Sequence, residues 1–339
     1  MNERPLAQAL YLALSDRQCH SGEALAQRLG VTRSAVWKAI EVLRELGLTI
    51  QARTHHGYEL GDSPGALCSV TLSKEISMMD SALLPEVALE VAWSLESTNT
   101  ALLESPPTYS GKLAVLIAEN QLGGRGRRGR TWRSRLGDSL CFSLAIRFET
   151  LPADLSALPL VVGLSVRRVL RERGVPAQLK WPNDIVIDRG ADGLAKLGGI
   201  LLELRAEAGG PALVVIGVGL NLRLDAAQRA EIASEGGHAT DLTSEGDHVL
   251  DRNSLAAALV KELRVALVSF SREGFISSFK AWPEADALAG RRVTVEQGGV
   301  LLEGLATGID TQGALQLRVA DRIERIHGGE VTVRPQPPT

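Results

Sequence analysis

The chain has 339 residues, of which 45% are hydrophobic, and a formal net charge of −3. This provides enough apolar material for two or three domains, and the near-neutral charge excludes a protein that is basic over its whole surface. The three cysteines are odd in number and far apart, which fits neither a disulfide framework nor a zinc cluster and predicts a reducing, cytoplasmic location. Neither a signal-peptide core nor a run of roughly 20 apolar residues is present, so we expect no membrane span.

Residues 1–63 have the pattern of a winged helix-turn-helix domain. Leucines recur at helical spacing up to Leu14, and two further helices are predicted, each after a residue able to cap it. These are residues 23–29 after Ser21 and residues 33–46 after Thr32, followed by a small hairpin of residues 49–51 and 58–60 that could form a wing.

The second of these helices predicts the DNA-binding surface. Val36, Ile40 and Leu43 form its buried stripe, which leaves the opposite face free for DNA. The predicted DNA-binding residues are Thr32, Arg33, Ser34, Trp37 and Lys38. Trp37 allows two interpretations, packing on the neighbouring domain or contact with a base, and a purely structural or protein-binding module remains the alternative for the whole unit.

A turn-rich linker, Asp62 to Gly65, leads to a central domain predicted over residues 70–285. Its strand-like runs at 114–118, 140–146, 185–187, 199–204 and 213–218 follow one another too often for a βαβ alternation, with helices predicted at 157–173 and 255–271. We therefore expect a mixed-sheet α+β domain and not a doubly wound fold. Residues 286–336 alternate in strand fashion, with turns at 297–299 and 310–313, and predict a small β-barrel-like domain.

The most informative segment is Gly123 to Trp132, in which four arginines alternate with four glycines. Such a loop is flexible and cationic, and we expect it to become ordered around an anion. About 50 residues later, Lys180 stands in the segment Lys180-Trp-Pro-Asn-Asp184. A mobile arginine loop and a fixed lysine are typical of sites that handle phosphate, although a short RNA-binding segment or a solvated loop would share the composition. It is not a P-loop, because no Gly-Lys-Ser/Thr closes it.

With these three parts assembled, the chain resembles the bifunctional biotin–protein ligases, or biotin operon repressors, nearly from end to end. The resemblance implies that the C-terminal domain is an SH3-like barrel. The resemblance depends on five motifs in the family's order. They are Glu96-Ser-Thr-Asn99, Gln121 with Gly124-Arg-Gly-Arg-Arg-Gly129, Lys180-Trp-Pro-Asn-Asp184, Lys196-Leu-Gly-Gly-Ile200 and Gly217-Val-Gly-Leu-Asn221.

The resemblance implies a two-step reaction with ATP and biotin as substrates. Biotin's carboxylate attacks the α-phosphorus of ATP to give biotinyl-5′-adenylate, and a lysine of a carrier protein then takes the biotin and releases AMP. Lys180 would be the catalytic lysine, with Arg127 and Asp184 assisting. The resemblance assigns biotin binding to Ser97, Thr98, Asn99, Gln121, Arg125, Gly126, Arg127, Arg128 and Lys180, and nucleotide binding to Arg128, Arg130, Trp132, Asn183, Lys196 and Asn221.

Mg²⁺ is expected only as the counter-ion of ATP, so no metal site of the protein itself is predicted. The expected partners are a biotin carboxyl carrier protein, operator DNA and, in a ligand-dependent manner, a second copy of the chain. Two functions remain as alternatives, a DNA-binding biotin sensor without ligase turnover and a lipoate or octanoate transferase of the same central fold.

The chain departs from the family after the arginine loop. Where the family commonly has Trp-x-Ser-Pro-x-Gly-x-Asn, this chain places Arg135 for the proline and Ser139 for the asparagine. The added positive charge of Arg133 and Arg135 could change how the loop folds over ATP.

Overall fold

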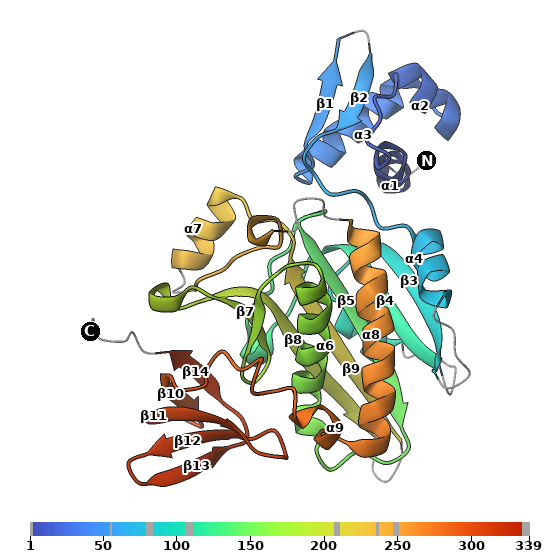
Figure 1. Ribbon diagram of the computed structural model, residues 1–339. Helices are drawn as coiled ribbons and strands as arrows, with labels where there is room; N and C mark the ends of the chain where they lie inside the picture. The colour runs from blue at the N-terminus through green and yellow to red at the C-terminus, as the bar shows by residue number, and fades with distance from the viewer. Residues whose placement is uncertain are drawn as a thin grey trace.

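The computed structural model describes residues 3–54, 56–78, 84–105, 112–206, 211–234, 237–246 and 251–333. Figure 1 shows three units: a small helical unit, a central sheet covered by helices, and a separate C-terminal sheet. No helix in the described part of the chain is long and apolar enough to cross a membrane.

The N-terminal unit has the predicted order of elements. It consists of α1 (Glu3–Leu14), α2 (Gly22–Leu29), α3 (Arg33–Glu45), β1 (Ile50–Arg53) and β2 (Gly57–Leu60). Ser21 and Thr32 cap the second and third helices as expected, since their hydroxyls accept hydrogen bonds from the backbone amides of Ala24 and Ala35. The helix-turn-helix prediction is therefore confirmed.

The central unit is built on one seven-stranded sheet with the order β3-β4-β5-β9-β8-β7-β6. Its strands are β3 (Glu86–Leu95), β4 (Lys112–Gln121), β5 (Ser139–Phe148), β6 (Ala177–Lys180), β7 (Asp184–Asp188), β8 (Leu194–Ala206) and β9 (Ala212–Asn221). Only β3 and β4 pair in parallel. The mixed-sheet prediction is confirmed, although β3 and β6 were not foreseen because neither has the apolar run of a central strand.

Helices cover this sheet unequally. They are α4 (Ser69–Ser77), α5 (Thr98–Glu104), α6 (Leu158–Glu172), α7 (Ala226–Ser234), α8 (Arg252–Glu273) and α9 (Ile276–Phe279). Short 3-10 helices lie at Arg127–Gly129 (η1), Leu155–Ala157 (η2), Gly190–Asp192 (η3) and Thr243–Glu245 (η4). The helices α6 and α8 lie across one face of the sheet and share its main apolar core (Figure 1). The other face has a much smaller apolar cluster beside α5, which leaves that side open for a site.

The C-terminal unit is a five-stranded antiparallel sheet with the order β13-β12-β11-β10-β14. Its strands are β10 (Arg292–Gln297), β11 (Val300–Ile309), β12 (Leu315–Val319), β13 (Arg322–Ile326) and β14 (Glu330–Val333). The strand prediction is confirmed, but closure into a barrel is not, because β13 and β14 are the two outer strands of this sheet. Gly329 to Val331 instead line a cavity of the central unit.

The predicted linker is held firmly by a buried network. The Tyr11 hydroxyl donates to the carbonyl of Pro64 over 2.6 Å, and Arg252 Nη1 donates to Glu119 Oε2 over 2.7 Å and to the carbonyl of Gly65 over 3.1 Å. The side chains of Arg252 and Glu119 are 0% and 2% exposed. Because a buried charge needs its partner, this pair fixes how α1, the linker, β4 and α8 meet.

A second connection runs from the segment after the arginine loop into the N-terminal core. Leu136 is 1% exposed and belongs to the same apolar cluster as Leu10, Ile40 and Leu43. Only three residues separate it from Trp132, which lines the central cavity. The N-terminal core is therefore completed by a residue of the central unit.

We predict that Leu136→Ala destabilises the protein by about 2–5 kcal/mol, the usual cost of truncating a buried leucine. Urea denaturation should show a lower midpoint, and proteolysis near residues 61–65 should become faster as the N-terminal unit loosens. The matched control is Leu151→Ala, since Leu151 is 37% exposed and outside the apolar clusters of the described residues. Equal, small effects of both changes would contradict the shared core.

Candidate active site

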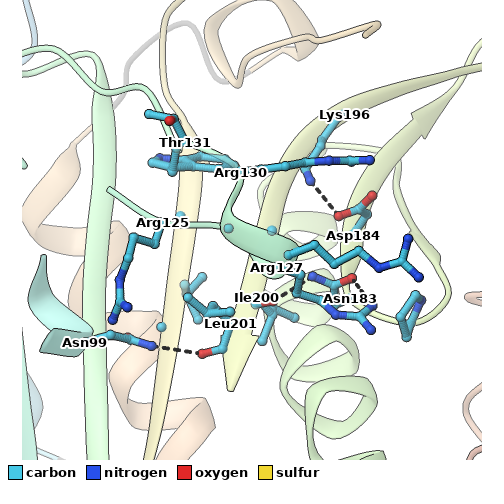
Figure 2. A pocket seen from close by; sticks show the side chains of 18 of the residues that line it. Asn99, Arg125, Arg127, Arg130, Thr131, Asn183, Asp184, Lys196, Ile200 and Leu201 are labelled. Atoms are coloured by element: carbon cyan, nitrogen blue, oxygen red, sulfur yellow. Dashed lines mark hydrogen bonds and ion pairs between the residues drawn. The ribbon is translucent and has the colours of Figure 1, made fainter. Parts of the chain in front are cut away.

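One cavity collects almost every residue that the sequence assigned to ligands (Figure 2). It lies where the start of α5, the arginine loop, the segment after β6, strands β8 and β9 and the start of β14 meet. The predicted residues that line it are Ser97, Thr98, Asn99, Gln121, Arg125, Gly126, Arg127, Arg128, Arg130, Trp132, Lys180, Asn183, Asp184 and Lys196. Asn221 is not among the residues that line it.

Four of the residues assigned to biotin, Ser97, Thr98, Asn99 and Gln121, form one buried polar cluster. Ser97 caps α5, where its hydroxyl accepts from the amide of Thr100 over 3.4 Å, so the helix-cap role and the cavity position coincide. Gln121 Oε1 accepts from the amide and the hydroxyl of Thr98, over 2.9 and 3.2 Å. Asn99 is also buried, and its Nδ2 donates to the carbonyl of Leu201 over 3.2 Å (Figure 2). Such fixed donors and acceptors suit an uncharged polar ligand.

The motif Gly217-Val-Gly219 in β9 has two glycines because neighbouring side chains leave no room for a Cβ at either position. A Cβ on Gly217 would stand 2.4 Å from Asn99 Oδ1, and one on Gly219 would stand 2.7 Å from the Trp132 ring. Both distances are far below van der Waals contact, so Asn99 and Trp132 can pack directly against the backbone of β9 only because these positions are glycines. The predicted position of Trp132 at the cavity follows from this contact.

The arginine loop has a defined fold of its own. Gly126 N donates to the carbonyl of Arg130 over 2.7 Å, and Trp132 N donates to the carbonyl of Gly124 over 2.8 Å, so the loop closes on itself around η1. Arg128 has a φ of 56°, a left-handed conformation that costs a non-glycine residue free energy and is common at functional loops.

Protein carboxylates hold this loop, which the sequence argument did not foresee. Arg128 Nη1 lies 3.4 Å from a carboxylate oxygen of Glu330, and Arg130 pairs with the same carboxylate. Arg127, half-buried, donates to Asn183 Oδ1 over 3.2 Å. Burial and the neighbouring Arg128 lower the pKa of Arg127, but a guanidinium remains charged. We expected an anion from a ligand to order the loop, but a carboxylate of the C-terminal sheet already pairs with two of its arginines.

Lys180 ends β6 and lines the cavity with its side chain largely buried. Within the described part of the chain its ammonium makes no hydrogen bond or ion pair. Burial lowers the pKa of Lys180, Lys196 lowers it further, and Asp184 opposes the change. A desolvated ammonium with unused donors has a strong preference for an anion beside it.

Asp184 pairs with Lys196 and not with Lys180. Its Oδ1 lies 2.6 Å from Lys196 Nζ, an interaction drawn in Figure 2, and Lys196 Nζ lies 6.0 Å from the centre of the Trp132 ring. Among the described residues no hydrogen bond or ion pair joins the side chains of Asp184 and Lys180, so Asp184 acts on the pKa of Lys180 through its charge. The assistance of Asp184 in catalysis stays a prediction. The direct contact places Lys196 over the aromatic wall of the cavity.

The two asparagines predicted at the nucleotide differ in position. Asn183 lines the cavity, where its Nδ2 donates to the carbonyl of Ile200 over 2.7 Å and its Oδ1 receives Arg127. Asn221 is buried at the end of β9, and its Nδ2 donates to the carbonyl of Thr240 over 3.1 Å and of Lys196 over 3.4 Å. Asn221 thus supports the backbone of Lys196, and its direct contact with a nucleotide stays a prediction.

The two arginines that follow Trp132 pair with the segment around α7. Arg133 pairs with Glu231, and Arg135, the residue in place of the family's proline, pairs with Asp225. Asp225 also accepts from the amide of Gln228 over 2.7 Å at the start of α7. The added charge therefore joins the loop to α7. Ser139, the other departure, is buried at the start of β5, opposite Asn221 in β9.

Sequence reasoning missed four polar residues that support the cavity. Ser143 and Glu203 hydrogen-bond Asn99, while Glu296 and Glu330 pair with Arg128. A serine inside the apolar run of β5 was the one available signal for Ser143. The glutamates had none, because their partners are 78 to 202 residues away in sequence.

Three family models match the chain in the order of its units. An HTH domain matches residues 6–59, the biotin/lipoate A/B protein ligase family matches residues 91–221, and the biotin protein ligase C-terminal domain matches residues 289–334. The bifunctional ligase/repressor BirA of Salmonella typhimurium is 35% identical over 98% of this chain and 99% of its own length. The chain belongs to the bifunctional biotin ligase/repressor family.

Two further matches cover about three quarters of the chain. The biotin--[acetyl-CoA-carboxylase] ligase of Mycobacterium tuberculosis is 34% identical over 72% of this chain and 88% of its own length. Among solved structures, the biotin protein ligase from Aquifex aeolicus in complex with biotin and ATP is 26% identical, with a TM-score of 0.60 over 73% of this chain and 99% of that chain.

The helix-turn-helix unit of this family member presents the predicted surface to solvent. Thr32, Arg33, Ser34 and Lys38 are exposed, and Trp37 is 54% exposed. Packing of Trp37 on the central unit is therefore wrong, and the second interpretation, contact with a nucleic-acid base, remains. Val36, Ile40 and Leu43 are buried as predicted.

The lowered pKa of Lys180 predicts how stability depends on pH. When folding lowers the pKa of an amine, the charged amine costs the folded state free energy at every pH below the lowered pKa. This cost decreases as the pH rises from the lowered pKa to the unfolded-state pKa of about 10.4. Lys180→Met should therefore raise the urea midpoint near pH 7, and the gain should shrink at higher pH. Lys74→Met, at an exposed helical lysine, is the control. A gain that stays constant with pH would show that charge burial is not its cause.

Proposed function

We propose that the protein is an ATP-dependent biotin–protein ligase that forms biotinyl-5′-adenylate and transfers biotin to a lysine of a biotin carboxyl carrier protein. The observation that carries the proposal is the position of Lys180. Its ammonium lines the same cavity as the buried Ser97–Asn99 cluster and the arginine loop, without a hydrogen-bond or ion-pair partner among the described residues. Membership of the ligase/repressor family supports the substrate assignment.

In the first step, an oxygen of the biotin carboxylate attacks the α-phosphorus of ATP, and the bond to pyrophosphate breaks. Two anions must approach each other, and their repulsion is a main obstacle. Lys180 would stand between carboxylate and α-phosphate, and its charge would be stabilised by the same anions that it brings together. The ureido ring of biotin would occupy the cluster of Ser97, Thr98, Asn99 and Gln121.

The arginine loop would then cover the intermediate. Arg127 and Arg128 are placed to bind carboxylate and phosphate oxygens, and the closed loop would keep water from the mixed anhydride. Lys196 and Trp132 would form the nucleotide side of the cavity, and Asp184 would hold Lys196 there. In the second step, the acceptor lysine attacks the carbonyl carbon and AMP leaves; a role of Asp184 in guiding this amine stays a prediction. Mg²⁺ would accompany ATP, held by phosphate oxygens and water.

The test is incubation of the purified protein with biotin, ATP and a biotin carrier domain, followed by mass spectrometry. Wild-type protein should yield bound biotinyl-adenylate and a biotinylated carrier lysine. Lys180→Ala should slow adenylate formation by about 10²–10³-fold, the usual effect of losing one charged stabilising group, while biotin binding changes little. Equal losses of binding and rate would contradict the catalytic assignment.

Two further measurements, pyrophosphate release and a competitive ligand titration, separate the alternative functions. A DNA-binding biotin sensor would bind biotin without releasing pyrophosphate, and a lipoate or octanoate transferase would prefer lipoate in a competitive titration. Either result would remove the ligase proposal. The unused donors of Lys180 favour the ligase, because a sensor has no need of a desolvated ammonium at the carboxylate.

We further propose that the N-terminal unit binds operator DNA and that the protein acts as a biotin-responsive repressor. The support is the exposed face of α3 and the match of residues 6–59 to an HTH domain. A ligand-dependent homodimer would place two such helices on paired half-sites. The proposal of a homodimer is supported by the family resemblance alone.

Two substitutions on this face should act differently on DNA affinity. Lys38→Ala should weaken binding to a duplex selected from a random pool and reduce the salt dependence by about one unit of slope, because a phosphate contact is lost. Trp37→Ala should weaken binding and leave the slope unchanged, since it removes no charge. Fluorescence anisotropy over a salt series measures both. Unchanged affinity in both variants would exclude α3 as the DNA-reading helix.

The domain division 1–63, 70–285 and 286–336 is part of the proposal. The outer ends of this division, residues 1, 2 and 334–336, lie outside the described residues, as do the internal gaps between the described ranges. Its support is the change of architecture near each boundary. We also propose that the C-terminal sheet is an SH3-like unit, supported by its five antiparallel strands and by the match of residues 289–334.

A further inference from the structure

Glu203 is a residue of β8 that neither the motifs nor the catalytic proposal use. It is not among the residues that line the cavity, yet its carboxylate touches two that are. Glu203 Oε2 accepts from Asn99 Nδ2 over 2.8 Å, and both of its oxygens accept from Arg125 Nη2, over 3.0 and 3.1 Å. One carboxylate thus joins the predicted ureido cluster to the arginine loop.

The register of the sheet explains this position. Leu201 stands opposite Gly217 in β9, and Asn99 lies directly over Gly217. Since side chains alternate along a strand, Glu203 lies on the same face as Leu201, two residues further along. It therefore meets Asn99 from the side, next to the carbonyl of Leu201, which accepts from the same amide nitrogen.

These contacts decide which way the Asn99 amide faces. Its nitrogen meets two acceptors, the Glu203 carboxylate and the carbonyl of Leu201. Its oxygen accepts from the Ser143 hydroxyl over 2.5 Å. A flipped amide would place its oxygen against a carboxylate, which is strongly unfavourable. Glu203 therefore fixes the hydrogen-bonding pattern that Asn99 offers to the cavity.

The same carboxylate anchors one end of the arginine loop. Arg128 and Arg130 pair with the C-terminal sheet, whereas Arg125 turns toward Asn99, as Figure 2 shows, and also donates to the Thr100 hydroxyl over 2.9 Å. The loop is consequently held at two ends by different carboxylates. Only the anchor at Glu203 lies beside the predicted ureido cluster.

We propose that Glu203 is a positioning residue that sets the Asn99 amide and the Arg125 guanidinium as one unit, so that recognition of the ureido ring and closure of the loop are coupled. The biotin half of this inference rests on the proposed function. Its structural half, the anchoring of the loop, does not.

The ion pair itself should contribute little to folding. The Arg125 and Glu203 side chains are 44% and 24% exposed, and pairs this accessible are worth little because water and salt screen them. Glu203→Gln has nearly the same shape, so it should fold normally while losing the charge. Any functional effect is then separable from a stability effect.

Steady-state kinetics with biotin and ATP test the coupling. Glu203→Gln should raise KM for biotin about 10-fold, the effect of one lost charge-assisted hydrogen bond, and leave KM for ATP and kcat within about twofold. Arg125→Met should have a similar effect, and the double variant should lose little more than the larger single loss, because both changes break one unit. The matched control is Glu90→Gln, at an exposed glutamate of β3 in the same sheet.

Limited trypsin digestion without any ligand tests the anchor separately. Cleavage after the arginines of residues 125–130 should be several-fold faster in Glu203→Gln than in wild type or Glu90→Gln, because opening of the loop exposes the peptide bonds. If wild type forms no biotinyl-adenylate but the cleavage rates differ as expected, the proposed function fails and the anchor stands.

Three results would overturn the inference. They are unchanged cleavage and unchanged KM for biotin in Glu203→Gln, an equal rise of KM for ATP and biotin, or additive losses in the double variant. A lower urea midpoint that accounts for the kinetic change would likewise replace positioning by a general loss of fold.

Discussion

Positive charge inside a partly desolvated cavity is the constraint on which the rest of the structure depends. Among the residues that the structure describes, six cationic side chains line the cavity, and two carboxylates, Asp184 and Glu330, line it with them. Such a concentration opposes folding through self-repulsion, and water cannot screen it where the cavity is buried. Carboxylates in and beside the cavity pair with the arginines and with Lys196. Lys180 has no such partner among the described residues.

Carboxylates from two different units hold the arginine loop. Glu203 of the central sheet holds Arg125, and Glu330 at the start of β14 holds Arg128 and Arg130. The C-terminal sheet is thus a wall of the cavity, and Trp181, next to Lys180, is tied to it by a hydrogen bond of 2.9 Å to the carbonyl of Gly313. A loop that is held by exposed ion pairs can exchange them for a ligand's phosphates at little cost, which suits a lid.

The N-terminal unit is joined to the same cavity through packed side chains. Leu136 lies in the N-terminal core, a few residues beyond Trp132, and Arg252 ties Glu119 of β4 to the linker at Gly65. A change in the loop around the ligand therefore has a short physical route to the helix-turn-helix.

The sequence by itself determined the elements whose signals are local. Capping residues, helical periodicity and apolar runs located α1 to α3, β4, β5, β7 to β9, α6 and α8, and the motif spacing selected the residues that meet at the cavity. β6 has only four residues, α7 lies in a largely polar segment, and β3 is an edge strand whose apolar residues are interrupted by Glu90, so none of the three was located. Barrel closure was expected from the strand alternation, the two turns and the family resemblance, and a local pattern of strands and turns does not fix how the edges of a sheet are used.

Only the tertiary structure decided which charges face each other. Asp184 pairs with Lys196, 12 residues further along the chain, because β7 and β8 are neighbours in the sheet. Asn221 supports the backbone of Lys196, and Glu203 and Glu330 hold the arginine loop, through contacts that span 25 to 202 residues. The physical reason is that a motif fixes the type of side chain at a position, whereas its partner is fixed by the register and packing of strands that the motif does not contain.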